Sequence, residues 1–187
     1  MNINNEELLM LDAIAYYQEL SDGDYETIGN FIEDVRKNGY KTVFNEVLFD
    51  YTDEDLGMDD IIELIDKRGE LKNLVLVYPE SSNLTSTSSI CLVDLNSDTP
   101  DVYVIYVGNY ADSPYKYKSE EISTWGNNVM GAIESDTAEQ KRQLDFYNKA
   151  IQAARDYLDN QDGDLNITVS GHSTGGNHAQ YVTIAFN

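Results

Sequence analysis

The sequence predicts an α/β protein in which helices flank a partial, mostly parallel sheet that begins with a hairpin. Apolar residues recur at helical spacing through the first 70 residues, and short continuous apolar runs follow from residue 74 onward. The C-terminal part then alternates strand, helix, strand and helix, an order that favours parallel pairing of its strands. We expect one domain over 1–187, with a helical part, 1–70, and a sheet part, 74–187.

Three helical segments are predicted in the first part. Apolar residues recur every three or four positions over 5–20, again over 28–35 and again over 61–65. Gly39 stands where a C-cap glycine is expected, and Gly69 follows the third segment in the same way. All three segments have the apolar stripe of a helix that packs on a core.

Short apolar runs predict the strands. The run 74–78 is closed by Pro79, and the Ser/Thr-rich stretch 81–89 predicts a loop. The runs 90–95 and 102–107 are joined by six residues that suit a turn. We therefore expect these two runs to form a hairpin.

The last elements are a long helix over 137–158, a strand over 165–169 and a helix over 174–186, with Gly163 stopping the long helix. The expected inner face of the long helix consists of Leu144, Tyr147, Ile151, Ala154 and Leu158.

Composition excludes several function classes. With 34 acidic and 12 basic residues the net charge is −22, which repels nucleic acid. No window approaches the ~20 apolar residues of a membrane span, and no basic leader opens the chain, so we expect a cytoplasmic protein; leaderless export would leave no such trace.

The single cysteine, Cys91, lies in an apolar run and is expected to be a buried thiol. The acidic stretch 50–60 lacks the spacing of a calcium loop, and we expect neither metal nor cofactor.

One motif carries chemistry. Gly171, Ser173 and Gly175 form GxSxG between a predicted strand and a predicted helix. A nucleophile at the tip of such a sharp turn needs small residues two positions before and after it, because strand and helix nearly collide there. The first amides of the helix can then stabilise an oxyanion. A glycine-rich turn without catalysis, or an anion-binding helix N-terminus, would show the same spacing.

The run GHSTGGNHAQY resembles the nucleophile elbow of the α/β-hydrolase superfamily, and in particular lipase class 3-like bacterial proteins with their GHSxGGNLA-like run. The resemblance spans about 74–187, through the hairpin, the run VYVIYVGNY, the Trp125 segment and the long helix. The family pattern has Arg at the position of Val107 and Leu at the position of His178.

The resemblance implies a set of site residues. Ser173 matches the nucleophile, and the amides of Thr174 and Asn109 match the two oxyanion donors. The implied elbow glycines are Gly171, Gly175 and Gly176, and the implied pocket residues are His172 and Trp125.

The partners of the serine are missing from this sequence. The chain has two histidines: His172 is the neighbour of Ser173 and should point away from it, and His178 lies about 140° away from Ser173 around the helix axis. Neither suits the triad base, so the triad Asp and His are expected in sequence absent here. The elbow strand is likewise expected at a sheet edge, to be completed by a C-terminal part or in a dimer.

Two functions follow as hypotheses. The first is a serine hydrolase that acts on a small ester or lipid, with this chain alone close to inert. The second is a catalytically inactive module of the same fold that binds protein.

Overall fold

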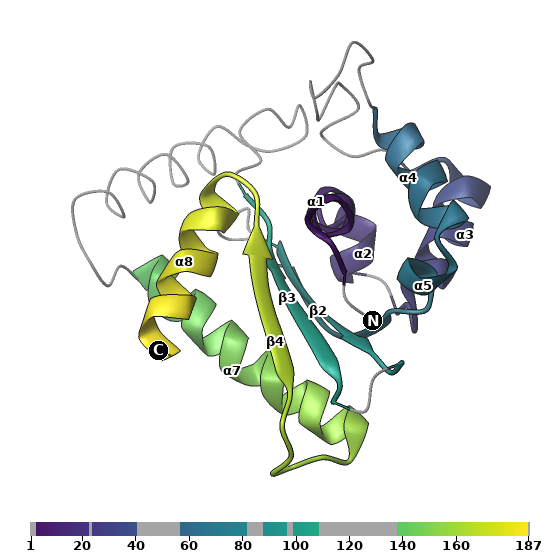
Figure 1. Cartoon of the computed structure of the whole chain (residues 1–187). Coiled ribbons are helices and arrows are strands. Elements are labelled where there is room, and N and C mark those ends of the chain that lie inside the picture. Colours follow the sequence, from purple (N-terminus) through teal and green to yellow (C-terminus); the bar gives the residue numbers. More distant parts are fainter. Residues whose placement is uncertain are drawn as a thin grey trace.

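The computed structural model of the chain describes residues 3–22, 24–40, 57–81, 88–96, 99–108 and 138–186. Within them, helices cover both faces of a four-stranded sheet (Figure 1), which is an α/β architecture as the sequence predicts. The strands are β1 (Val75–Ser81), β2 (Ser88–Asp94), β3 (Asp101–Tyr106) and β4 (Asn166–Gly171), and they lie side by side in that order.

The sheet is mixed. β1 pairs with β2 and β2 pairs with β3, both antiparallel, whereas β3 and β4 are parallel. The predicted hairpin and the predicted parallel pair are therefore confirmed, but a mostly parallel sheet is wrong for the described strands. The reason lies in the connections: short links permit antiparallel pairing only, and the long crossover that parallel strands need occurs between β3 and β4.

The first strand is longer than predicted. β1 runs through Pro79, which pairs with Ile90, and continues to Ser81; Ser89 is likewise part of β2 rather than of a loop. Proline is tolerated in β1 because this strand forms an edge of the sheet, where the missing N–H can face away from the partner strand.

Helices of the first part lie on one side of the sheet. They are α1 (Asn5–Ile14), α2 (Gln18–Asp22), α3 (Ile28–Asn38), α4 (Met58–Lys67) and α5 (Gly69–Lys72). Of these, α1 and α2 pack on the strands, and α3, α4 and α5 lie beyond them (Figure 1). The single helix predicted over 5–20 is in fact two, because the N–H groups of Tyr16 and Tyr17 bond to carbonyl oxygens only three residues earlier and the helix ends there. Gly39 is the left-handed C-cap of α3, at φ 65°, as predicted. Gly69 does not cap a helix but begins α5.

The other face is covered by α7 (Ala138–Leu158) and α8 (Thr174–Phe186). Both helices were predicted within one residue. The most deeply buried row of α7 consists of Gln143, Phe146, Ala150 and Ala154. The other predicted inner residues, Leu144, Tyr147, Ile151 and Leu158, are half-buried beside that row. The predicted inner face is displaced from the buried row because it was assigned from apolar residues, and Gln143 is polar although it is buried. The side-chain amide of Gln143 donates a hydrogen bond to Glu139.

Two apolar cores result, one on each face of the sheet. Cys91 is fully buried, as predicted, and burial raises the pKa of its thiol to about 12. Among the described residues, β4 has a neighbour on one side only, and its first three residues are exposed. The described helices include none with the length and apolar character that crossing a membrane requires.

Candidate functional site

Ser173 occupies a strained turn between β4 and α8. Its φ is 59°, and in the described part of the chain only Asp159 is another non-glycine residue with positive φ. This region of backbone space is unfavourable for side chains other than glycine, and strain of this kind persists where the surroundings enforce it. Ser173 is exposed. The turn therefore holds a serine at a solvent-accessible tip at a cost in conformational energy.

The glycines of the motif are required by the close crossing of strand and helix. A Cβ on Gly171 would lie 2.5 Å from the carbonyl carbon of Gly175 and 2.7 Å from the carbonyl oxygen of Tyr106. A Cβ on Gly175 would overlap that same oxygen, and one on Gly176 would lie 3.1 Å from the oxygen of Gly171. The neighbouring atoms are backbone, which cannot move aside as a flexible side chain can. This agrees with the steric reason that predicted glycine at these positions.

Backbone hydrogen bonds close the turn. The N–H of Gly175 donates to the carbonyl of His172, and the N–H of Gly176 donates to the carbonyl of Ser173, each at 3.0 Å. Thr174, the proposed oxyanion donor, is the first residue of α8. Its amide thus belongs to the helix N-terminus, where the partial positive charge of the helix dipole lies.

Gly108, which the sequence did not single out, brings the end of β3 against the serine. The residue is buried, and a Cβ on it would lie 3.0 Å from the Cβ of Ser173 and 2.5 Å from the hydroxyl oxygen of Tyr16. Its N–H donates to that hydroxyl at 3.0 Å. The residue after it, Asn109, was predicted as an oxyanion donor and lies outside the described residues, as does Trp125.

His172 is held by the N-terminal part of the chain. Its Nδ1 lies 3.0 Å from the hydroxyl of Tyr16, and the two rings meet edge to face with centroids 6.0 Å apart. The imidazole is exposed whereas Tyr16 is buried. In the described contacts the imidazole of His172 makes no hydrogen bond with Ser173.

A second contact joins the N-terminal part of the chain to β4, from Asp12 near the end of α1. Ser170 donates its hydroxyl to Asp12 at 2.8 Å, and the other carboxyl oxygen of Asp12 is buried without a hydrogen-bond partner. Burial raises the pKa of Asp12 to about 7, although the hydrogen bond from Ser170 acts in the opposite direction. Asp12 and Tyr16 are about one helical turn apart, and they contact alternate residues at the end of β4.

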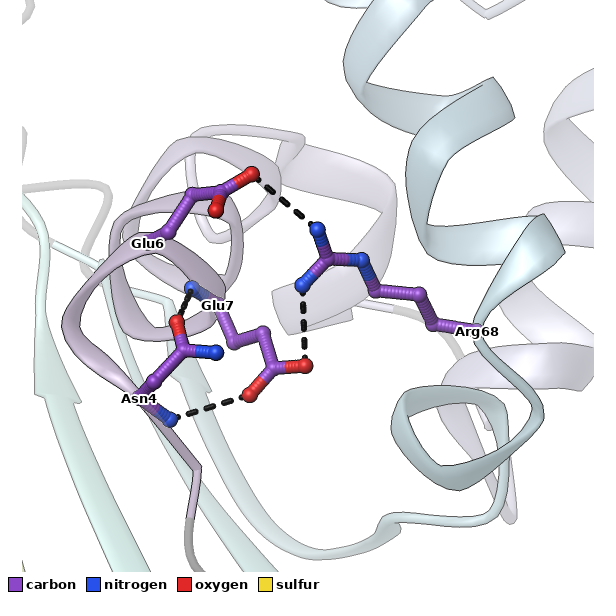
Figure 2. A network of polar contacts seen from close by, with 4 residues as sticks. All are labelled: Asn4, Glu6, Glu7 and Arg68. Atoms are coloured by element: carbon purple, nitrogen blue, oxygen red, sulfur yellow. Dashed lines mark hydrogen bonds and ion pairs between the residues drawn. The ribbon is translucent and has the colours of Figure 1, made fainter.

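The opposite end of α1 is fixed by a network of polar contacts (Figure 2). Asn4 and Glu7 form a capping box, with side-chain to backbone distances of 2.9 and 3.0 Å. Arg68, between α4 and α5, binds Glu7 at 2.9 Å and Glu6 at 3.0 Å. Because Glu7 is nearly buried, its pairing with Arg68 ties α1 to the neighbouring helices. α1 is thus held at both ends, by Arg68 and by the elbow.

His178 lies on the other side of the sheet. His178 is 3% exposed and packs edge to face on Tyr106, and among the described residues neither ring nitrogen has a hydrogen-bond partner. Burial lowers the pKa of His178; the charge of Glu139 opposes this effect, whereas that of Arg142 adds to it. A buried, neutral imidazole between β3 and α7 is not available to Ser173.

Sequence patterns found the turn but missed its supports. Tyr16 lies 156 positions before His172, and Asp12 lies 158 positions before Ser170. Neither has a local signal, because both belong to an ordinary amphipathic segment. Gly108 could have been noticed as a small residue at the end of a predicted strand.

The described residues thus define an α/β protein with a strained, exposed serine at a strand-to-helix turn. In this part of the chain no cluster of His, Cys, Asp and Glu suits a metal ion. Comparison with protein-family models, curated proteins and solved structures found no match. Any function must therefore be inferred from the geometry and from the motif.

Proposed function

We propose that the protein is a serine hydrolase of the α/β-hydrolase superfamily that acts on carboxylic esters, as lipases and esterases do. The observation that supports this most directly is the φ of 59° at Ser173. A turn without a chemical role has no need for a serine in a conformation that glycine adopts freely. Glycines stand instead at the two flanking positions, where strand and helix touch.

The proposed reaction is acyl transfer through Ser173. Its Oγ attacks the ester carbonyl carbon while a general base takes the hydroxyl proton, and the amides of Thr174 and Asn109 stabilise the negative oxygen. The bond to the leaving alkoxide then breaks, and the base returns the proton to it, which releases an alcohol. Water hydrolyses the acyl-serine by the same route and releases the carboxylic acid.

The general base is proposed to come from outside this sequence. The chain contains two histidines; Tyr16 engages the Nδ1 of His172, and His178 is buried away from the serine. An Asp and a His supplied by a C-terminal part or by a dimer partner would complete the triad, and β4, which has one neighbouring strand among the described residues, is the natural place for such a part to join. The 187-residue chain by itself is expected to turn over very slowly.

A fluorophosphonate probe tests this proposal, because it reacts only with an activated serine. In the complete gene product, the probe should label Ser173, and Ser173→Ala should abolish labelling. Ser21→Ala is the matched control, since it removes a buried hydroxyl of α2 that has no partner. Absence of label at Ser173 in the folded wild type would refute the proposal.

A second function is a protein-binding module that keeps the elbow as an architectural turn. The specific observation in its favour is that, among the described residues, neither histidine ring hydrogen-bonds to Ser173. This candidate predicts that Ser173→Ala leaves partner binding and the cellular phenotype intact. Esterase activity of the complete gene product would exclude it.

A further inference from the structure

We propose that Tyr16 is a positioning residue for the nucleophile turn, acting through His172 and Gly108. The inference rests on the proposed function, because a fixed turn matters for chemistry only if Ser173 reacts. It assigns a role in the site to the N-terminal helical part, which the hydrolase motif leaves without one.

A single oxygen atom joins the ends of two neighbouring strands. The hydroxyl of Tyr16 receives the N–H of Gly108 at 3.0 Å, just past the end of β3, and lies 3.0 Å from the Nδ1 of His172, just past the end of β4. Each bond crosses from the helical layer to the sheet. Together they set the spacing between the two backbone segments that meet at the serine.

These contacts are adjacent to the proposed reacting atom. The position that a Cβ on Gly108 would occupy lies 2.5 Å from the Tyr16 oxygen and 3.0 Å from the Ser173 Cβ. His172 precedes Ser173 directly, and its carbonyl accepts the hydrogen bond that closes the turn. A shift of His172 or Gly108 would therefore move the Ser173 side chain with it.

The hydrogen bond with Tyr16 also restricts the imidazole of His172. A tyrosine hydroxyl carries one proton and can accept as well as donate. The Tyr16 oxygen accepts the N–H of Gly108 and has a second lone pair, so it either donates its proton to the Nδ1 of His172 or accepts one from it, and either bond selects one tautomer of the imidazole. The exposed ring beside the nucleophile is then held through its Nδ1 in one orientation and one tautomer.

Tyr17 shows that packing alone does not account for this arrangement. It is as deeply buried as its neighbour, at 1% exposure against 2%, and its ring packs on Phe31 at a centroid distance of 5.2 Å. Within the described part of the chain its hydroxyl makes no hydrogen bond to the turn at Ser173. The chain leaves α1 at Ile14, and the turn that follows directs Tyr16 toward the sheet ends. Tyr17→Phe is accordingly a matched control for Tyr16→Phe.

Nitrogen-15 NMR of the histidine rings tests the inference without any need for catalysis. The full 187-residue chain has two histidines, so His172→Gln assigns both sets of signals. The wild type and Tyr17→Phe should show His172 as a single tautomer with Nδ1 in a hydrogen bond, as donor or as acceptor. Tyr16→Phe should show the tautomer mixture of a free imidazole.

The result that overturns the inference is a wild-type His172 that already behaves as a free imidazole, or ring signals that Tyr16→Phe leaves unchanged. The wild-type measurement decides the matter even if Tyr16→Phe fails to fold, as judged by circular dichroism.

The second readout is the rate of fluorophosphonate labelling at Ser173 in the complete gene product. Misplacement of a reacting group by about 1 Å can cost about 100-fold in rate, so Tyr16→Phe should slow labelling by about tenfold to 100-fold and Tyr17→Phe by less than about twofold. Equal rates for Tyr16→Phe and the wild type would count against the positioning role. If the wild type itself is not labelled, the proposed function fails, and the ring signals of His172 still decide whether Tyr16 holds it.

Discussion

The buried carboxyl of Asp12 should make stability depend on pH in a direction opposite to that of an ordinary salt-bridged aspartate. Its side chain is 5% exposed, accepts one hydrogen bond from Ser170 and has one oxygen with no partner. Burial therefore raises its pKa from 3.8 to about 7. Between these values the folded state binds a proton that the unfolded state has released, so stability falls as the pH rises through this window.

The size of the effect follows from the pKa difference. The folded and unfolded values, about 7 and 3.8, differ by about three pH units, each worth about 1.36 kcal/mol, or about 4 kcal/mol over the full range. Roughly 3 kcal/mol of this falls between pH 5 and pH 8. Asp12→Asn removes the titration and keeps an oxygen that can accept the Ser170 hydroxyl.

The assay is urea denaturation of the wild type and Asp12→Asn at several pH values. The free energy of unfolding of the wild type, relative to the variant, should fall by roughly 3 kcal/mol between pH 5 and pH 8. Asp145→Asn is the control, because Asp145 is exposed on α7 and pairs with Lys149. If the difference between the wild type and Asp12→Asn stays constant within about 0.5 kcal/mol, the proton on Asp12 is not coupled to folding and the inferred burial of its charge is wrong.

Two further substitutions probe the supports of the elbow. Gly175→Ala forces a methyl group onto a backbone oxygen of β3 and should lower the free energy of unfolding by about 1–3 kcal/mol. Gly69→Ala is the control, because the space around Gly69 is open, and it should be neutral or slightly stabilising. Equal effects of the two substitutions on the free energy of unfolding would contradict the close crossing of strand and helix. Arg68→Met leaves the nearly buried carboxylate of Glu7 without its charged partner and should cost about 1–2 kcal/mol in chemical denaturation. Lys67→Met removes an exposed pair and should cost less than about 0.5 kcal/mol, so similar losses would show that the network in Figure 2 is not structural.

Local rules predicted most elements of the fold and placed the glycine-flanked turn at Ser173. Helix periodicity and capping located α3, α7 and α8, and the apolar runs located the strands, because each depends on neighbours within a few residues. Predictions failed where a distant partner overrides local preference. Pro79 continues a strand because β1 lies at a sheet edge, and the segment 5–20 breaks into two helices at Tyr16.

By itself, the sequence determined that a serine would stand between glycines at a strand-to-helix turn, since the steric demands of that turn are local. Only the tertiary structure decided what surrounds the serine. The packing of α1 and the turn after it brings Asp12 and Tyr16 to the end of β4 across more than 150 positions. The packing of α8 on the other face buries its own residue His178 against Tyr106 of β3. Such contacts depend on how whole elements pack, and no pattern along the chain records them.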